Sequence, residues 1–254
     1  MSQLLNYKLE GEGHTIVLIH GLFGNLDNLG LLARNLKQDH QVLSIDLRNH
    51  GLSFHHELHT YQAQAEDVKA LLQHLNIERS TLIGHSMGGK VAIKVAELLE
   101  TQVQQLLVLD MAPVDYQVQR HDNVFAGLQA VNSAKPESRK QALEILAQHI
   151  ELEGVRQFLS KSLYKNDNHL AWRFSVENLW NNYRHIMSWQ PIQQISTPTL
   201  FIKGANSDYL QAEHQRDIQA QFSQAKAHII ANTGHWLHAE KPEEVLRIIR
   251  KFIG

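Results

Sequence analysis

Short runs rich in valine, isoleucine and leucine alternate along this chain with segments of helical spacing, and this alternation restricts the fold more than any other feature. Runs such as residues 16–19 and 106–109 are entirely apolar, as is typical of parallel strands that helices cover on both faces. Strand–helix alternation predicts an α/β fold with right-handed crossovers between its strands. The sheet is expected to be mostly parallel and doubly wound, with helices on both sides.

The apolar runs and the helical patterns give the expected order of elements. The expected strands are Thr15–His20, Gln41–Leu47, Thr81–His85, Val103–Asp110, Thr199–Lys203 and Ala227–Ala231, with Leu4–Glu10 as an antiparallel strand at the edge. The expected helices are Leu29–Gln38, Tyr61–Leu75, Gly88–Leu99, Ala212–Gln221 and Pro242–Phe252.

This order is interrupted between approximately residues 114 and 196, where the sequence has helical patterns but no strand pattern. We therefore expect residues 1–254 to form a single α/β domain, with residues 114–196 inserted as a helical cap between sheet strands. Ligands enter such sheets at the carboxyl edge, so the cap is expected to cover the binding site. Three tryptophans of this segment are candidate substrate-binding residues: Trp172, Trp180 and Trp189.

Composition excludes several classes of function. The chain has a formal net charge of −2 and lacks long runs of like charge, which argues against nucleic acid or an anionic membrane as its main partner. No apolar stretch approaches the ~20 residues of a membrane span, and the start lacks a secretory pattern, so a cytoplasmic protein is expected. The absence of cysteine excludes disulfides and a cysteine nucleophile. Because His55, His56 and His59 lack the spacing of a zinc site, we expect a solvated loop there and no metal.

Ser86 stands at the centre of Gly84-His85-Ser86-Met87-Gly88, between a short apolar run and a helical pattern. The two glycines have no Cβ, so strand and helix can approach closely while the serine adopts a strained backbone conformation. This pattern is typical of a nucleophile elbow and makes a serine hydrolase the leading hypothesis. Because glycine-rich β–α turns also produce the pattern by chance, other functional residues must support it.

A serine hydroxyl needs a base within hydrogen-bonding reach, and an acid must orient that base. His235 follows Gly234 in the loop between the final apolar run and the final helix, which places it at the same edge of the sheet as Ser86. His238 is the alternative, but its place next to the last helix favours a packing or capping role. We predict His235 as the base.

Two aspartates qualify as the acid, because both follow strands and preserve the chain order serine, acid, histidine. Asp110 ends the strand after the elbow helix, and Asp208 follows the strand beyond the inserted segment. In a purely structural role, Asp110 anchors the entrance of the cap and Asp208 serves as a turn or helix-capping residue. Spacing alone leaves both aspartates open as the acid.

The oxyanion that forms during ester cleavage needs preorganised N–H donors, each worth about 3–4 kcal/mol in the transition state. Met87, directly after the candidate nucleophile, offers one backbone N–H at the start of a helix. The loop after the strand Thr15–His20 offers the other, because Gly21 permits close approach and Leu22 presents the next N–H. Leu22 and Met87 are therefore the predicted oxyanion hole.

The chain resembles the α/β-hydrolase superfamily along nearly its whole length. Four segments in the correct order carry the resemblance: 20–24 (HGLFG), 46–53 (DLRNHGLS), 84–89 (GHSMGG) and 234–236 (GHW). Within this superfamily the chain resembles the YbfF-type esterase branch. This narrower resemblance rests on Asn49, where many relatives have glycine, and on residues 110–114 (DMAPV) and 204–207 (GANS).

The resemblance implies hydrolysis of short acyl esters, extending to acyl-CoA thioesters, without a cofactor. It implies Asp110 as the acid, although Asp208 stands where the wider superfamily usually places it. The predicted mechanism is cleavage through an acyl-enzyme at Ser86, with a small acyl ester or thioester as the partner. Alternatives are a carbon–carbon hydrolase or lyase with the same three residues and, less favoured, a non-catalytic ligand-binding scaffold.

Overall fold

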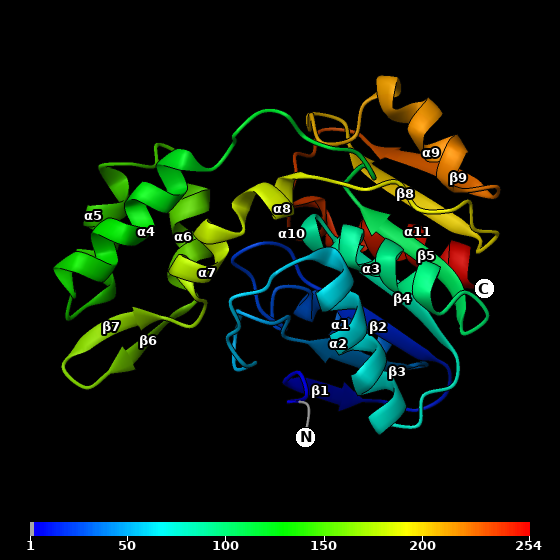
Figure 1. Ribbon diagram of the computed structural model, residues 1–254, viewed down its shortest axis with the longest axis horizontal. Helices are drawn as coiled ribbons and strands as arrows, with labels where there is room; N and C mark the ends of the chain where they lie inside the picture. The colour runs from blue at the N-terminus through cyan, green and yellow to red at the C-terminus, as the bar shows by residue number, and fades with distance from the viewer. Residues whose placement is uncertain (1–2) are drawn as a thin grey trace.

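A seven-stranded sheet forms the centre of the molecule (Figure 1). The computed structural model describes residues 3–254, and the strands lie in the order β1-β3-β2-β4-β5-β8-β9. Their bounds are β1 Tyr7–Glu10, β2 Thr15–Ile19, β3 Gln41–Ile45, β4 Ser80–His85, β5 Val103–Leu109, β8 Thr199–Gly204 and β9 Ala225–Ile230. Among the strands of this described sheet, β1 alone pairs antiparallel. The mostly parallel sheet and its antiparallel edge strand confirm the prediction.

Helices cover both faces of the sheet. They are α1 (Gly30–Leu36), α2 (Tyr61–His74), α3 (Met87–Leu98), the short 3-10 helix η1 (Ala212–His214), α9 (Gln215–Gln221), α10 (Leu237–Glu240) and α11 (Pro242–Ile253). In β2, Val17 and Ile19 pack with α2 and α3, whereas Ile16 and Leu18 pack with α1 and α11. All four side chains are buried, so each face of the sheet carries its own hydrophobic core.

The loops that follow the parallel strands meet at the carboxyl edge of the sheet. Because β2 lies between β3 and β4, the strand order reverses beside β2, and this reversal is where ligands bind in open α/β sheets. The Ser86 N–H donates to Leu109 O (3.0 Å), and the Asp110 N–H donates to Ile202 O (2.8 Å). These bonds extend the parallel ladders just past the ends of β4 and β5.

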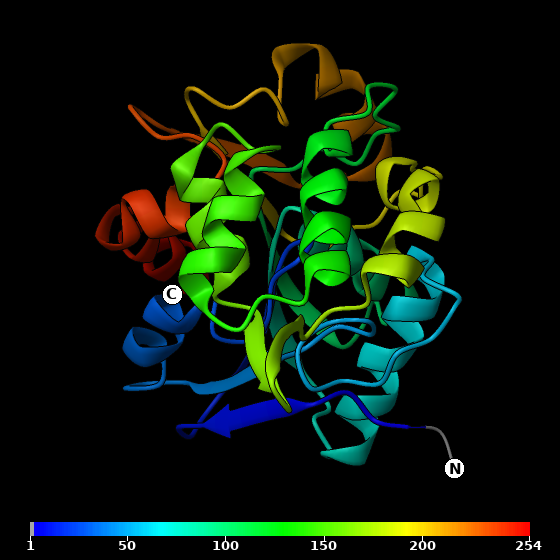
Figure 2. The same cartoon turned by 90° about the vertical axis from the view of Figure 1, so that its left-hand side faces the viewer.

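Residues 114–196, here called the inserted segment, form a separate group of elements beyond the carboxyl edge (Figure 1). They contain α4 (Asp122–Ala134), α5 (Arg139–Ala147), α6 (Glu153–Ser160), β6 (Leu163–Asn166), β7 (His169–Trp172), α7 (Val176–Asn181) and α8 (Tyr183–Met187). Figure 2 shows the helices of this segment in front of the sheet. The β6–β7 hairpin corrects the expectation of a segment without strands. Each of its strands has four residues and is only partly buried, so neither carries an apolar run as long as those of the central sheet.

The loop after β3 is held by the buried side chain of Asn49. Its Nδ2 donates to His56 O (2.9 Å) and lies 3.1 Å from His59 Nδ1, while Asn178 Nδ2 donates to its Oδ1 (3.0 Å). His59 is only 1 % exposed, whereas His55 and His56 are exposed. The expectation of a solvated loop is therefore wrong for His59, whose ring packs inside the loop.

Neither a membrane-crossing helix nor a metal-binding cluster occurs within residues 3–254. No helix in that range is both long and apolar enough to span a bilayer. No three histidine, aspartate or glutamate side chains gather there in a way that would hold a metal ion.

Candidate active site

Ser86 stands at the sharp turn between β4 and α3 in a strained backbone conformation. Its φ and ψ are 54° and −124°, a region that residues with a side chain rarely adopt. A Cβ at Gly84 would lie 2.2 Å from the carbonyl oxygen of Gly88, and a Cβ at Gly88 would lie 2.3 Å from that of His20. Both positions therefore require glycine, and the close approach of strand and helix agrees with the sequence pattern.

Ser86, His235 and Asp110 form a continuous chain of hydrogen bonds, although they come from three different loops. Ser86 Oγ lies 2.9 Å from His235 Nε2, and His235 Nδ1 lies 2.7 Å from Asp110 Oδ2. Because a carboxylate only accepts, Nδ1 carries the proton and Nε2 is free to accept the proton of the serine hydroxyl. Tyr209 stacks on the imidazole with ring centroids 4.0 Å apart. Such an arrangement is able to activate a serine hydroxyl as a nucleophile.

The Asp110 side chain is fully buried and has two donors besides His235. The Gly204 N–H donates to Oδ1 at 3.0 Å, and the Ser207 hydroxyl donates to Oδ2. These hydrogen bonds fix the plane of the Asp110 carboxylate. Spacing does not single out Ser207, because serine is common in ordinary turns.

Asp208, the alternative acid of the sequence analysis, lies outside this chain of hydrogen bonds. Its side chain is 67 % exposed and pairs with Arg120 of the inserted segment, with 2.7 Å between Oδ2 and Nη1. The hydrogen bond from Arg120 lowers the pKa of the Asp208 carboxyl. The fold thus brings Asp110, rather than Asp208, to His235.

His238, the alternative base, is buried against the ring of His85, with centroids 4.3 Å apart. Burial lowers the pKa of His238 to about 3, and its Nδ1 has no hydrogen-bond partner within residues 3–254. His85 has a different contact, because its Nε2–H donates to the carbonyl oxygen of His235 at 2.8 Å. His85 therefore supports the loop of the candidate base, and His238 packs behind it.

The backbone N–H groups of Leu22 and Met87 have no hydrogen-bond acceptor within the described part of the chain. Leu22 lines the same cavity as Ser86, and Met87 follows Ser86 directly at the start of α3. A Cβ at Gly21 would lie 3.1 Å from Ser86 Cβ, so the loop after β2 runs against the elbow. Two unpaired donors at such a place suit an oxyanion.

Two buried histidines hold the loop that carries Leu22. The Leu47 N–H donates to His20 Nε2 (3.0 Å), so His20 Nδ1–H donates to Gly21 O (2.8 Å). The Phe23 N–H donates to His50 Nε2 (3.1 Å). Burial lowers the pKa of both imidazoles, which keeps them neutral and able to accept these bonds.

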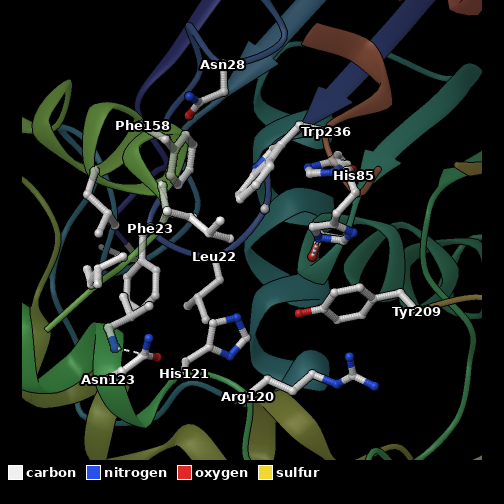
Figure 3. Close-up of a pocket in the computed structure, with 18 of the residues that line it drawn as sticks. Leu22, Phe23, Asn28, His85, Arg120, His121, Asn123, Phe158, Tyr209 and Trp236 are labelled. Atoms are coloured by element: carbon white, nitrogen blue, oxygen red, sulfur yellow. Dashed lines mark hydrogen bonds between the residues drawn. The ribbon is translucent and has the colours of Figure 1, made fainter. Parts of the chain in front are cut away.

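A cavity of about 610 Å³ opens beside Ser86 and His235. Figure 3 shows Phe158 and Trp236 facing each other near one end, with Arg120 at the other end. The apolar side chains of the lining are Leu22, Phe23, Val124, Ile150, Leu152, Val155, Phe158, Leu159 and Trp236. Most of them come from the inserted segment, which supplies one wall. Trp236 was not predicted to line the binding site. Its position directly after His235 is the sequence signal that could have identified it.

None of the three tryptophans predicted to bind substrate lines this cavity. Trp172 is buried, and its Nε1–H donates to Leu128 O (3.2 Å). Trp189 is also buried, and its Nε1–H donates to Gln221 Oε1 (2.8 Å). Trp180 is 43 % exposed on the surface of the segment. The prediction is therefore corrected: these indoles pack the segment and its junction with the sheet, where each buried N–H finds an acceptor.

Comparison with known proteins shows which family the chain belongs to. Residues 14–242 match a family described by the alpha/beta hydrolase fold. The chain belongs to this α/β-hydrolase family. It is 48 % identical over 239 residues to Esterase YbfF of Escherichia coli (strain K12), covering 94 % of this chain and 92 % of that protein. It is also 48 % identical over 256 residues to a putative esterase/lipase of Haemophilus influenzae (strain ATCC 51907 / DSM 11121 / KW20 / Rd), covering 99 % and 88 % respectively.

A solved structure agrees with these relatives. The structure titled "Marine microorganism esterase" has a TM-score of 0.95 and 33 % sequence identity, with 99 % of this chain and 100 % of that chain covered. The protein is therefore an α/β hydrolase of the esterase/lipase type. The family and fold expected from the sequence resemblance are confirmed.

Proposed function

We propose that this α/β hydrolase cleaves carboxylic esters through an acyl-enzyme at Ser86, with His235 as the base and Asp110 as the acid that orients it. The observation that carries the proposal is the unbroken chain of hydrogen bonds from the buried Asp110 carboxylate to the Ser86 hydroxyl. The identity of 48 % to an esterase over nearly the full length supports the class of reaction.

In the first half of the reaction, Ser86 Oγ attacks the acyl carbonyl carbon while its proton passes to His235 Nε2. The oxyanion accepts hydrogen bonds from the N–H groups of Leu22 and Met87, and Asp110 stabilises the imidazolium. The imidazolium then gives its proton to the leaving alcohol as the carbon–oxygen bond breaks. The acyl group stays on Ser86.

In the second half, a water molecule gives a proton to His235 Nε2 and attacks the carbonyl carbon of the acyl-enzyme. The same two N–H groups bind the second oxyanion. When it collapses, the bond to Ser86 Oγ breaks, and the serine oxygen takes the proton back from His235. The carboxylic acid leaves, and the hydrogen-bond chain is restored.

For the substrate we propose a short acyl ester, with acyl-CoA thioesters as an extension of the same chemistry. The largely apolar lining of the 610 Å³ cavity favours an acyl chain, which forms no hydrogen bonds of its own. A thioester follows the same steps, with a thiol as the leaving group. Because the inserted segment supplies one wall, we also propose that residues 114–196 act as the cap that selects the acyl group.

Replacement of Ser86 tests the nucleophile. Ser86→Ala should retain the wild-type circular dichroism spectrum and lose hydrolysis of p-nitrophenyl butyrate by roughly 10⁴-fold or more. Ser133→Ala, on the exposed side of α4, is the matched control and should keep full activity. A fluorophosphonate probe should label the wild type at Ser86. Undiminished turnover by pure Ser86→Ala protein would contradict the proposal.

The substrate class needs a separate experiment. Values of kcat/KM should be measured for p-nitrophenyl esters and acyl-CoAs of increasing chain length on the same preparation. The proposal expects short p-nitrophenyl esters to be turned over best and acyl-CoAs to be cleaved by the same serine. Retention of thioesterase activity in Ser86→Ala protein would separate the two reactions.

A further inference from the structure

Lys90 is a fully buried lysine at the centre of the molecule. It lies on the first turn of α3, four positions after Ser86, and is 1 % exposed. Within residues 3–254 no carboxylate forms an ion pair with it. A buried charge without a counter-ion is costly, so other contacts must hold the Lys90 ammonium.

Three backbone carbonyl groups accept hydrogen bonds from Lys90 Nζ. The distances are 2.8 Å to Val114 O, 3.2 Å to Met187 O and 3.1 Å to Ser188 O. An ammonium group has three N–H donors and no acceptor, so one side chain satisfies all three carbonyl groups. No other residue type offers three donors at a single atom on an unbranched stem.

These carbonyl groups belong to the two ends of the inserted segment. Val114 lies where the chain leaves the sheet after β5, and Met187 and Ser188 lie where it returns after α8. Figure 1 shows α8 at the junction between the segment and the sheet. The two ends also contact each other, because the Tyr116 N–H donates to Met187 O at 3.0 Å. We call residues 112–116 and 186–190 the stems of the inserted segment.

Aromatic rings from both stems and from α2 surround the same nitrogen. Lys90 Nζ lies 4.7 Å from the ring centroid of Tyr116, 5.6 Å from that of Tyr61 and 5.8 Å from that of Trp189. Each ring face attracts a cation. Tyr61 is itself tied to the second stem, because its hydroxyl donates to Ile186 O at 2.6 Å. Hydrogen bonds and rings together make one binding site for an ammonium group between the stems.

We propose that Lys90 is a positioning residue whose ammonium group ties both stems to α3 and so sets the cap wall of the cavity against Ser86. This inference rests on the proposed function, because it concerns the cavity in which the acyl group would bind. α3 begins directly after Ser86, and the cavity wall with Val124 and Val155 lies in the chain between the two stems. This connection between the helix of the nucleophile and both stems therefore helps to fix the width of the acyl site. Burial also lowers the pKa of Lys90 to about 7.

Lys90→Met tests the proposal, because methionine fills similar space without donors or charge. Lys94→Met is the matched control: Lys94 lies one turn further along α3 and pairs with Glu97. For Lys90→Met we expect at least tenfold faster amide hydrogen exchange in both stems and a melting temperature no more than a few degrees below wild type. Lys94→Met should leave stem exchange unchanged.

Kinetics separate positioning from a merely structural role. Fluorophosphonate labelling of Ser86 should stay within threefold of wild type in Lys90→Met, because the Lys90 side chain bonds to the stems and forms no hydrogen bond with Ser86 or His235. KM for a hexanoyl ester should rise at least tenfold, with a smaller change for an acetyl ester. Equal KM values and equal stem exchange in Lys90→Met and Lys94→Met would overturn the proposal. If Ser86→Ala retains turnover, the proposed function fails, yet the exchange experiment still decides whether Lys90 holds the stems.

A second measurement covers the case in which Lys90→Met does not fold. In the wild type, a neutral amine donates only two hydrogens, so at least one carbonyl loses its bond when Lys90 deprotonates. The other ionisable groups that face this site are Asp115, Tyr61, Tyr116 and, across Tyr116, Arg120. The ratio of amide hydrogen exchange in the stems to that in α3 should rise at least threefold between pH 6 and pH 9. A constant ratio would overturn the proposal.

Discussion

Asp110 and His235 lie 125 positions apart in the chain, yet a hydrogen bond of 2.7 Å joins Asp110 Oδ2 to His235 Nδ1. The parallel sheet explains how they meet, because β5 and β9 are separated only by β8 and both end at the same edge. The Gly204 N–H and the Ser207 hydroxyl hold the carboxylate from the other side. The Asp110 carboxylate is therefore held in place by the fold itself.

Comparison of Asp110→Asn with Asp208→Asn tests which aspartate is the acid. In Asp110→Asn the amide can donate to Nδ1, so the imidazole takes the wrong tautomer and kcat should fall by about 10³–10⁴-fold. Asp208→Asn removes only an exposed ion pair with Arg120 and should change kcat by less than roughly threefold. The measurement is steady-state hydrolysis of p-nitrophenyl butyrate. A larger loss in Asp208→Asn would assign the acid to Asp208 instead.

Gly88→Ala tests the close approach of α3 to the loop after β2. The new Cβ would lie 2.3 Å from His20 O, so backbone must move, and we expect a loss of about 1–3 kcal/mol in the free energy of unfolding. Gly154→Ala is the control, because nothing lies within 4 Å of a Cβ there; it should leave stability unchanged or raise it slightly. Urea unfolding measures both, and equal midpoints for the two variants would contradict the prediction.

Buried histidines should make the fold sensitive to acid. Burial lowers the pKa of His59 to about 3 and that of His238 to about 3, whereas an unfolded histidine has a pKa of about 6.5. Below pH ~6.5 the unfolded chain binds more protons than the folded chain, so stability is lost as the pH falls. Each histidine contributes a loss of up to about 1.4 kcal/mol per pH unit. Urea unfolding between pH 7.5 and pH 5 measures the slope.

Two variants in the loop after β3 test whether buried histidines cause this dependence of stability on pH. His59→Asn should give a shallower dependence of stability on pH than the wild type, because it removes a histidine that must stay neutral in the folded state. His55→Asn, four residues earlier and exposed, should leave the slope unchanged. If both variants keep the slope of the wild type, the acid sensitivity comes from other groups.

The sequence predicts the sheet well and the site unevenly, for physical reasons. Continuous apolar runs mark strands that are buried on both faces, whereas β6 and β7 have four residues each and are only partly buried, so they are too short to stand out in the sequence. Spacing does not separate Asp110 from Asp208, because both follow parallel strands and only the direction of each loop decides which side chain turns inward. Trp172, Trp180 and Trp189 mark an aromatic segment, but burial of an indole inside that segment and exposure to a cavity leave the same sequence pattern.

Narrowing the cap wall tests the acyl site. Val155 lies on α6, lines the cavity and is only partly buried, so a larger side chain can extend into the cavity without overpacking a core. In Val155→Trp, kcat/KM for an octanoyl ester should fall by roughly tenfold or more, because a pocket discriminates by the apolar volume it accepts. The value for an acetyl ester should change little, since a two-carbon acyl group stays beside Ser86. Trp180→Leu, at an exposed position that does not line the cavity, is the control and should leave the ratio of the two substrates unchanged. An unaltered ratio in Val155→Trp would show that the acyl chain does not run along α6.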